Sequence, residues 1–131
     1  MTLVTLCAVL VLGATPPAAV QADPREQLTT AVAHGIKLLE AKDHLRFMKE
    51  FISPDDMKKV LGSRPEIDAT MAQKFGEQKA PLLLEALKDA QKGTPRYDAE
   101  GVTAVYPLKT PIGGREVLAF VKVGKLWYIR N

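Results

Sequence analysis

Residues 115–131, REVLAFVKVGKLWYIRN, have the pattern of a complete β-hairpin. Apolar and β-branched residues fill two runs, Arg115 to Val123 and Leu126 to Arg130, as is typical of strands. Gly124-Lys125 separates the runs, and a glycine in first place suits a two-residue type II′ turn. Such a turn fixes the register and predicts three cross-strand pairs: Val123 with Leu126, Val121 with Tyr128, and Phe120 with Ile129.

Both faces of this predicted hairpin are apolar. Because side chains alternate along a strand, one face collects Leu118, Phe120, Trp127 and Ile129, and the other collects Val117, Ala119, Val121, Leu126 and Tyr128. A sheet with one face in water would carry polar residues on that face. We therefore expect helices to cover both faces, or a second subunit to cover one of them. A homodimer would use the face that holds Val117, Ala119, Val121 and Tyr128.

The chain beyond Ala22 divides into a helical part and a strand part. Helical periodicity runs from Asp23 to about Lys92, and strand periodicity follows. Val102 to Leu108 is a further predicted strand, Pro95 to Asp98 is a short fourth, and a loop through Pro111, Gly113 and Gly114 leads to the hairpin. This order predicts one α+β domain over residues 23–131, with N-terminal helices packed on a C-terminal antiparallel sheet of three or four strands.

The first helix is expected to begin at Asp23, which would act as N-cap before Pro24. At 3.6 residues per turn its buried face is predicted to hold Leu28, Ala31, Val32, Gly35, Ile36, Leu38 and Leu39. A glycine in the middle of that face indicates the close approach of another backbone.

Further helices are predicted from their start and stop signals. The segment Asp43 to Ile52 groups apolar residues on one face. Ser63 and Glu66 have the spacing of a capping box and predict the start of a later helix, which Gly76 would end. The last helix is expected from about Ala80 to Lys92.

Residues Met1 to Ala22 have the pattern of a cleavable signal peptide. The run Leu3 to Leu12 is apolar but too short to span a bilayer, and a Pro pair soon follows it. Val20-Gln21-Ala22 places small residues where signal peptidase requires them, so we expect cleavage after Ala22. The alternative is a buried N-terminal helix, which the Pro pair disfavours. We expect an exported protein, periplasmic or extracellular, with no membrane span in the mature chain.

Composition excludes several chemistries from the mature chain. The one cysteine, Cys7, lies in the signal segment, so no disulfide, thiol nucleophile or thiolate metal site is predicted. The net charge of +3 is spread over alternating Lys, Arg, Asp and Glu, which predicts no nucleic-acid partner. No phosphate loop, serine elbow or dinucleotide motif occurs, so no cofactor is expected. His34, expected in solvent, does not have metal-ligand spacing with Glu40, Asp43 or His44.

Two segments resemble the nuclear transport factor two-like superfamily, which has a cone-shaped, cystatin-like α+β fold. They are Leu118 to Asn131 (LAFVKVGKLWYIRN), similar to its final hairpin, and Asp43 to Pro54 (DHLRFMKEFISP), similar to its second helix. The likeness to small exported bacterial members covers about half of the mature chain. It implies a cone-like fold with a cavity that the second helix helps to line. The small number of predicted strands departs from the superfamily pattern and implies a shallow cone.

Six residues are predicted to line such a cavity: His44, Phe47, Phe51, Tyr106, Phe120 and Trp127. The helical wheel places His44 on the apolar side of its helix. Two interpretations of His44 stay open, a pocket acid or base, or a partly buried histidine bonded to a backbone carbonyl. Tyr106 is either a hydrogen-bond donor to a bound carbonyl or an ordinary strand tyrosine.

Three classes of function remain. The leading hypothesis is an exported non-catalytic module that binds a small apolar ligand or a protein partner, because the hairpin is apolar on both faces and catalytic motifs are missing. The alternative is a small isomerase-like or dehydratase-like enzyme with His44 as base and Tyr106 as hydrogen-bond donor. A cystatin-like inhibitor is disfavoured, since the sequence shows no exposed inhibitory wedge.

Overall fold

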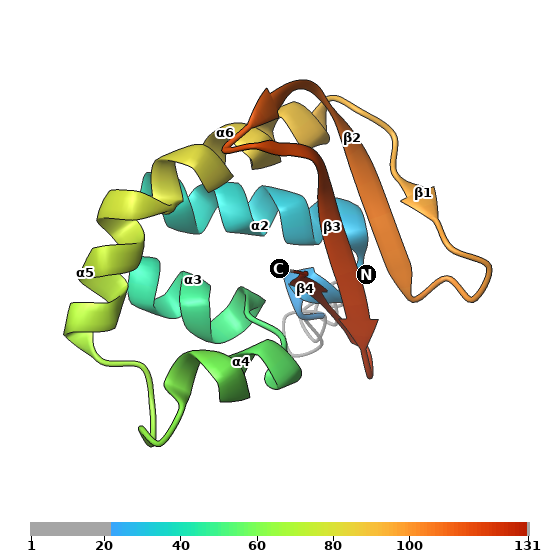
Figure 1. Ribbon diagram of the computed structural model, residues 1–131. Coiled ribbons are helices and arrows are strands. Elements are labelled where there is room, and N and C mark those ends of the chain that lie inside the picture. The colour runs from blue at the N-terminus through green and yellow to red at the C-terminus, as the bar shows by residue number, and fades with distance from the viewer. Residues whose placement is uncertain (1–21, 131) are drawn as a thin grey trace, which may run out of the picture.

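A computed structural model describes residues 22–130 and shows helices followed by an antiparallel sheet (Figure 1). The predicted α+β class, with the helices N-terminal, is confirmed. In chain order the elements are η3 (Pro24–Glu26), α2 (Leu28–Glu40), α3 (His44–Phe51), α4 (Pro54–Leu61), α5 (Ala69–Gln78), α6 (Ala80–Gln91), β1 (Arg96–Tyr97), β2 (Thr103–Ile112), β3 (Arg115–Val123) and β4 (Leu126–Ile129). The segment Met1 to Ala22, predicted to be a signal peptide, lies outside the described residues except for Ala22.

The sheet has the strand order β1-β2-β3-β4, with every neighbouring pair antiparallel. The three predicted pairs of the final hairpin are confirmed, and Gly124 takes a positive φ of 64° while Lys125 does not, as a type II′ turn requires. The short fourth strand is β1. The loop expected through Gly113 and Gly114 is instead a two-residue turn that joins Ile112 to Arg115. Its φ values of 59° and 80° are accessible to glycine, so β2 extends further than the sequence predicted.

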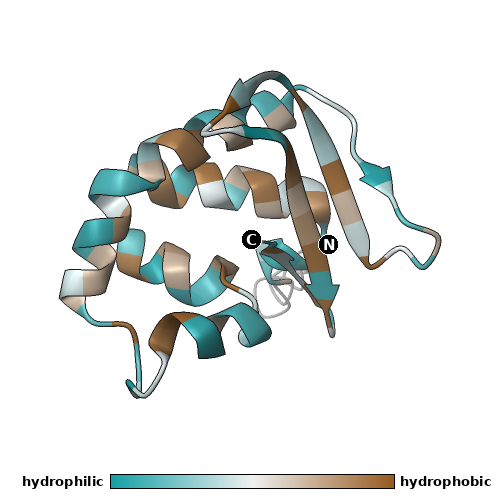
Figure 2. Ribbon diagram, viewed as in Figure 1, coloured by the Kyte–Doolittle hydropathy of each residue, from teal (hydrophilic) through white to brown (hydrophobic). Residues whose placement is uncertain are grey.

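The main core lies between α2, α6 and one face of the sheet, and Figure 2 shows apolar residues on all three. The predicted buried face of α2 is confirmed residue for residue. The reason proposed for Gly35 is wrong, because side chains and not a backbone approach it. A Cβ at Gly35 would lie 3.2 Å from Leu87 Cδ1 and 3.3 Å from Phe47 Cε2.

Three predicted helix boundaries are also wrong. Asp23 caps the 3-10 turn η3, and α2 begins later, at Leu28. Asp68, not Ser63, caps α5 by accepting a hydrogen bond from the Met71 amide at 2.9 Å. Gly76 lies inside α5 rather than at its end, because the His44 ring packs directly against it.

The two faces of the hairpin have different surroundings. The face with Leu118, Phe120 and Trp127 is buried against the helices. The other face is half-buried to exposed, and the helices lie on the opposite side of the sheet (Figure 1). Within residues 22–130 one group that lies over part of this face is the Arg25 guanidinium, 5.7 Å from the centroid of the Tyr128 ring. Helical cover of both faces is therefore wrong, and cover by a second subunit stays a prediction.

None of the helices in the described part of the chain has the length and apolar character needed to cross a membrane.

Candidate functional site: an apolar groove with a cationic rim

A groove of about 760 Å³ opens between the helices and the sheet. Residues of α3, α4, α5 and α6 line one side, and residues of β2, β3 and the end of β4 line the other. The groove exists because β4 is short. It pairs with Phe120 to Val123, so within the described residues Glu116 to Leu118 have no strand partner on that edge of β3.

The floor of the groove is apolar. The Phe47 ring stacks on the rings of Phe51 and Phe75, with centroid distances of 4.8 and 5.6 Å. Leu108 of β2 and Leu118 of β3 complete the opposite wall. Three of the six most exposed large apolar side chains in the described part of the chain also line the groove: Val60, Leu82 and Val117. An apolar surface gathered in one concave place is typical of a binding site.

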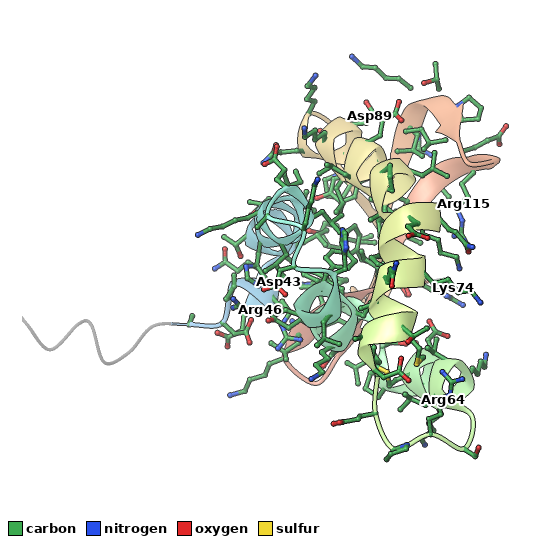
Figure 3. All side chains as sticks on the ribbon, turned by 90° about the vertical axis from the view of Figure 1, so that its left-hand side faces the viewer. Asp43, Arg46, Arg64, Lys74, Asp89 and Arg115 are labelled. Atoms are coloured by element: carbon green, nitrogen blue, oxygen red, sulfur yellow. The ribbon has the colours of Figure 1, made fainter. Side chains whose placement is uncertain are left out.

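The rim of the groove is positively charged. Its lining includes five cationic residues, Arg64, Lys74, Lys79, Arg115 and Arg130, against one carboxylate, Asp56. The whole chain has 18 cationic and 15 acidic residues, so the excess at the groove is local. Figure 3 shows Arg64, Lys74 and Arg115 on one side of the molecule, although they come from the segment after α4, from α5 and from β3. Such a rim attracts anionic groups.

Two of the six predicted cavity residues, Phe47 and Phe51, line the groove. Tyr106, Phe120 and Trp127 do not line it; like Phe47 and Phe51 they lie in the main core, with exposed fractions of 2%, 0% and 5%. Tyr106 and Phe120 pack edge to face with a centroid distance of 5.8 Å. Burial raises the pKa of the Tyr106 hydroxyl, and the nearby Tyr97 adds to that rise.

His44 lines a second, shallow cavity of about 280 Å³ at the outer side of α3 and α5. Its ring packs against Gly76 and meets the Phe75 ring edge to face at a centroid distance of 6.0 Å. Neither cavity is lined by both His44 and Tyr106, so the structure does not bring this proposed base and donor into one pocket.

The rim could not be predicted from the sequence, because its cations lie in separate segments with no shared spacing. A partial signal was present in α5. Met71 and Phe75 repeat at four-residue spacing, and Lys74 and Gln78 repeat beside them, which marks the border of an amphipathic face. All four of these residues line the groove.

A second polar constellation lies around Glu50, outside the groove lining. The carboxylate of Glu50 accepts a hydrogen bond from Arg46 Nε at 2.6 Å, and its other oxygen lies 2.8 Å from His34 Nε2. The Arg25 guanidinium bonds to the Glu50 backbone carbonyl at 2.6 Å and to Asp23. His34 is therefore held in this network and not in solvent, contrary to the prediction. The network links the start of the domain to α2 and α3 by hydrogen bonds.

We expect this network to make the free energy of unfolding depend on pH. Burial raises the pKa of Glu50, but hydrogen bonds from Arg46 and His34 outweigh it and hold the pKa below the ordinary 4.5. The carboxylate thus stabilises the fold above about pH 4.5, and that contribution is lost as pH falls through the lowered pKa. Glu50→Gln should cost about 0.5–1.5 kcal/mol at pH 7, with the difference from wild type shrinking in acid. Urea unfolding between pH 3 and 7 measures it.

The matched control is Glu85→Gln, because Glu85 is exposed on α6. It should unfold like wild type at every pH. An equal loss of stability at pH 3 and pH 7 in Glu50→Gln would contradict the role given to the carboxylate charge.

Within residues 22–130 no group of three or more His, Cys, Asp or Glu side chains is placed to hold a metal ion. Comparisons of the chain with protein-family models, with curated proteins and with solved structures found no match. The resemblance to the nuclear transport factor two-like superfamily therefore stays a prediction.

Proposed function

We propose that this protein is an exported, non-catalytic binding module whose groove holds a small apolar ligand or an apolar segment of a protein partner. The proposal depends on one observation. A groove of about 760 Å³, lined by aromatic and aliphatic side chains, lies open between α5, α6 and the edge of β3. A domain with a complete core and no binding role has little reason to leave such a surface in water.

The exported location rests on the sequence of Met1 to Ala22 alone. One structural feature bears on this location, at the start of the domain. Asp23, the residue that would follow cleavage, donates its backbone N–H to the Glu26 carboxylate and accepts a hydrogen bond from the Arg25 guanidinium. An ordered first residue suits a domain that begins there.

The enzyme alternative receives no support from the geometry. Its proposed base, His44, lies against Gly76 in the shallow second cavity, and its proposed donor, Tyr106, is buried in the core. A general base must reach the proton that it abstracts within hydrogen-bond distance, in a pocket shared with the donor.

The outer face of the hairpin is the second apolar surface of the protein. Val117 and Val123 are exposed there, and Ala119, Val121 and Tyr128 are partly buried. Val117 also lines the groove, so the homodimer predicted through this face would share that residue with the groove.

The binding role predicts that a neutral apolar dye such as Nile red becomes fluorescent in the groove. Leu82→Ser on α6 and Val117→Ser on β3 should each weaken dye binding about threefold to tenfold, because each removes part of an apolar wall. Both side chains are surface-exposed, at 45% and 43%, so the substitutions leave the core intact. Fluorescence titration measures the dissociation constants.

Val123→Ser is the matched control. Val123 lies on the same strand as Val117 and is equally exposed, at 44%, but does not line the groove. Its dye affinity should equal that of wild type. Equal affinities for all three variants and wild type would show that the dye binds elsewhere and would remove the proposed function.

A further inference from the structure

We propose that the occupant of the groove is a single-chain amphiphile, a hydrocarbon chain that ends in one carboxylate. This inference rests on the proposed binding role and adds the chemistry of the ligand. It follows from two features that meet in one place, the apolar floor and the cationic rim.

The floor sets the chemistry and size of the ligand body. Above the buried, stacked rings of Phe47 and Phe51, the more accessible side chains of the lining are also apolar: Phe75, Leu82, Leu83 and Leu108. The volume of about 760 Å³ lies within the range of about 300–1,000 Å³ that holds small-molecule ligands. We therefore assign one hydrocarbon chain to the groove, rather than the two chains of a membrane lipid.

The rim sets the sign of the headgroup. Arg64, Lys74 and Arg115 project from three separate segments toward the same side of the molecule (Figure 3). Lys79 and Arg130 also line the groove, and Asp56 is its one acidic residue. A cationic headgroup would meet repulsion, and a neutral one would gain nothing from these charges.

Three charges of the rim, those of Arg64, Lys74 and Lys79, are available to a ligand. Within the described residues Lys74 and Lys79 take part in no ion pair, and Arg64 has a loose one, with Nη1 3.8 Å from Asp68 Oδ2. Exposed pairs of that kind contribute little to stability. A carboxylate at the mouth of the groove would therefore not have to displace a strong internal partner.

The test compares three ligands with the same twelve-carbon chain: dodecanoate, 1-dodecanol and dodecyltrimethylammonium. Calorimetric titration of the purified protein, below the concentrations at which these compounds form micelles, gives each dissociation constant. We expect dodecanoate to bind about tenfold more tightly than 1-dodecanol, and the ammonium compound to bind most weakly. Added salt should weaken the binding of dodecanoate and leave that of dodecanol unchanged.

A charge-reversal variant locates the effect. Arg64→Glu with Lys74→Glu should weaken dodecanoate binding about tenfold and leave dodecanol binding unchanged. The control, Lys37→Glu with Lys92→Glu, makes the same change in net charge at exposed positions outside the groove lining. It should bind all three ligands like wild type. The comparison of the three ligands on the wild-type protein tests the proposal even if a variant folds poorly.

The outcomes separate the two proposals. Equal binding of the three ligands would overturn the carboxylate headgroup and leave the apolar groove in place. No binding of any of them, together with no Nile red binding, would overturn the proposed function itself. Binding to phosphatidylglycerol vesicles without binding to monomeric dodecanoate would overturn the single-chain ligand in favour of a membrane surface.

Discussion

Replacing Phe51 by alanine is expected to lower the free energy of unfolding by about 3–5 kcal/mol. Phe51 is 1% exposed, the Phe47 ring stacks on it, and its Cζ would lie 3.5 Å from a Cβ at Gly35. α3 and α2 therefore meet through this ring, and the space left by truncation is bounded by aromatic side chains and helix backbone that cannot collapse into it. Urea unfolding followed by the fluorescence of Trp127, the one tryptophan, measures the loss.

The control for Phe51 is Val60→Ala on α4. Val60 also lines the groove, but it is exposed, and α4 buries none of its residues. Its effect on stability should stay within about 0.5 kcal/mol. A similar loss for both variants would mean that α4 carries part of the core, which the burial of its residues contradicts.

The parts of the fold that were predictable from the sequence are those set by local chemistry. Gly124-Lys125 fixes the hairpin register, because a two-residue turn allows one pairing of the flanking strands. The face of α2 was predictable since its seven buried residues repeat with the helical period over a long, uninterrupted element.

The groove was not predictable in the same way. It depends on where β4 ends relative to β3, and on how α5 and α6 are placed against that free edge. These are distances between elements, and no periodic pattern encodes them. Aromatic character alone could not separate Phe51, which borders the groove, from Phe120, which does not, because both are almost fully buried.

The start and end of α5 show a different limit. Both Ser63 and Asp68 carry side chains that cap helices, and the structure selects Asp68. Glycine often ends a helix, but Gly76 lies inside α5, where the absence of a Cβ leaves room for the His44 ring of α3. A residue that satisfies a local rule can be present for a tertiary reason.

The contact between Gly76 and His44 can be measured, because the effect of Gly76→Ala on the free energy of unfolding should depend on whether the His44 ring is present. An alanine Cβ at position 76 would lie 2.6 Å from His44 Cε1 and closer still to Nδ1. The variant should therefore lose about 1–3 kcal/mol through overpacking, even though alanine is the better helix former. In a His44→Ala background the same substitution should instead be neutral or stabilise by up to about 1 kcal/mol, the helix propensity difference. Urea unfolding of the two single variants and the double variant gives the coupling energy. If Gly76→Ala costs the same in both backgrounds, then the His44 ring is not what excludes a side chain at Gly76, and the contact assigned to α3 and α5 is wrong.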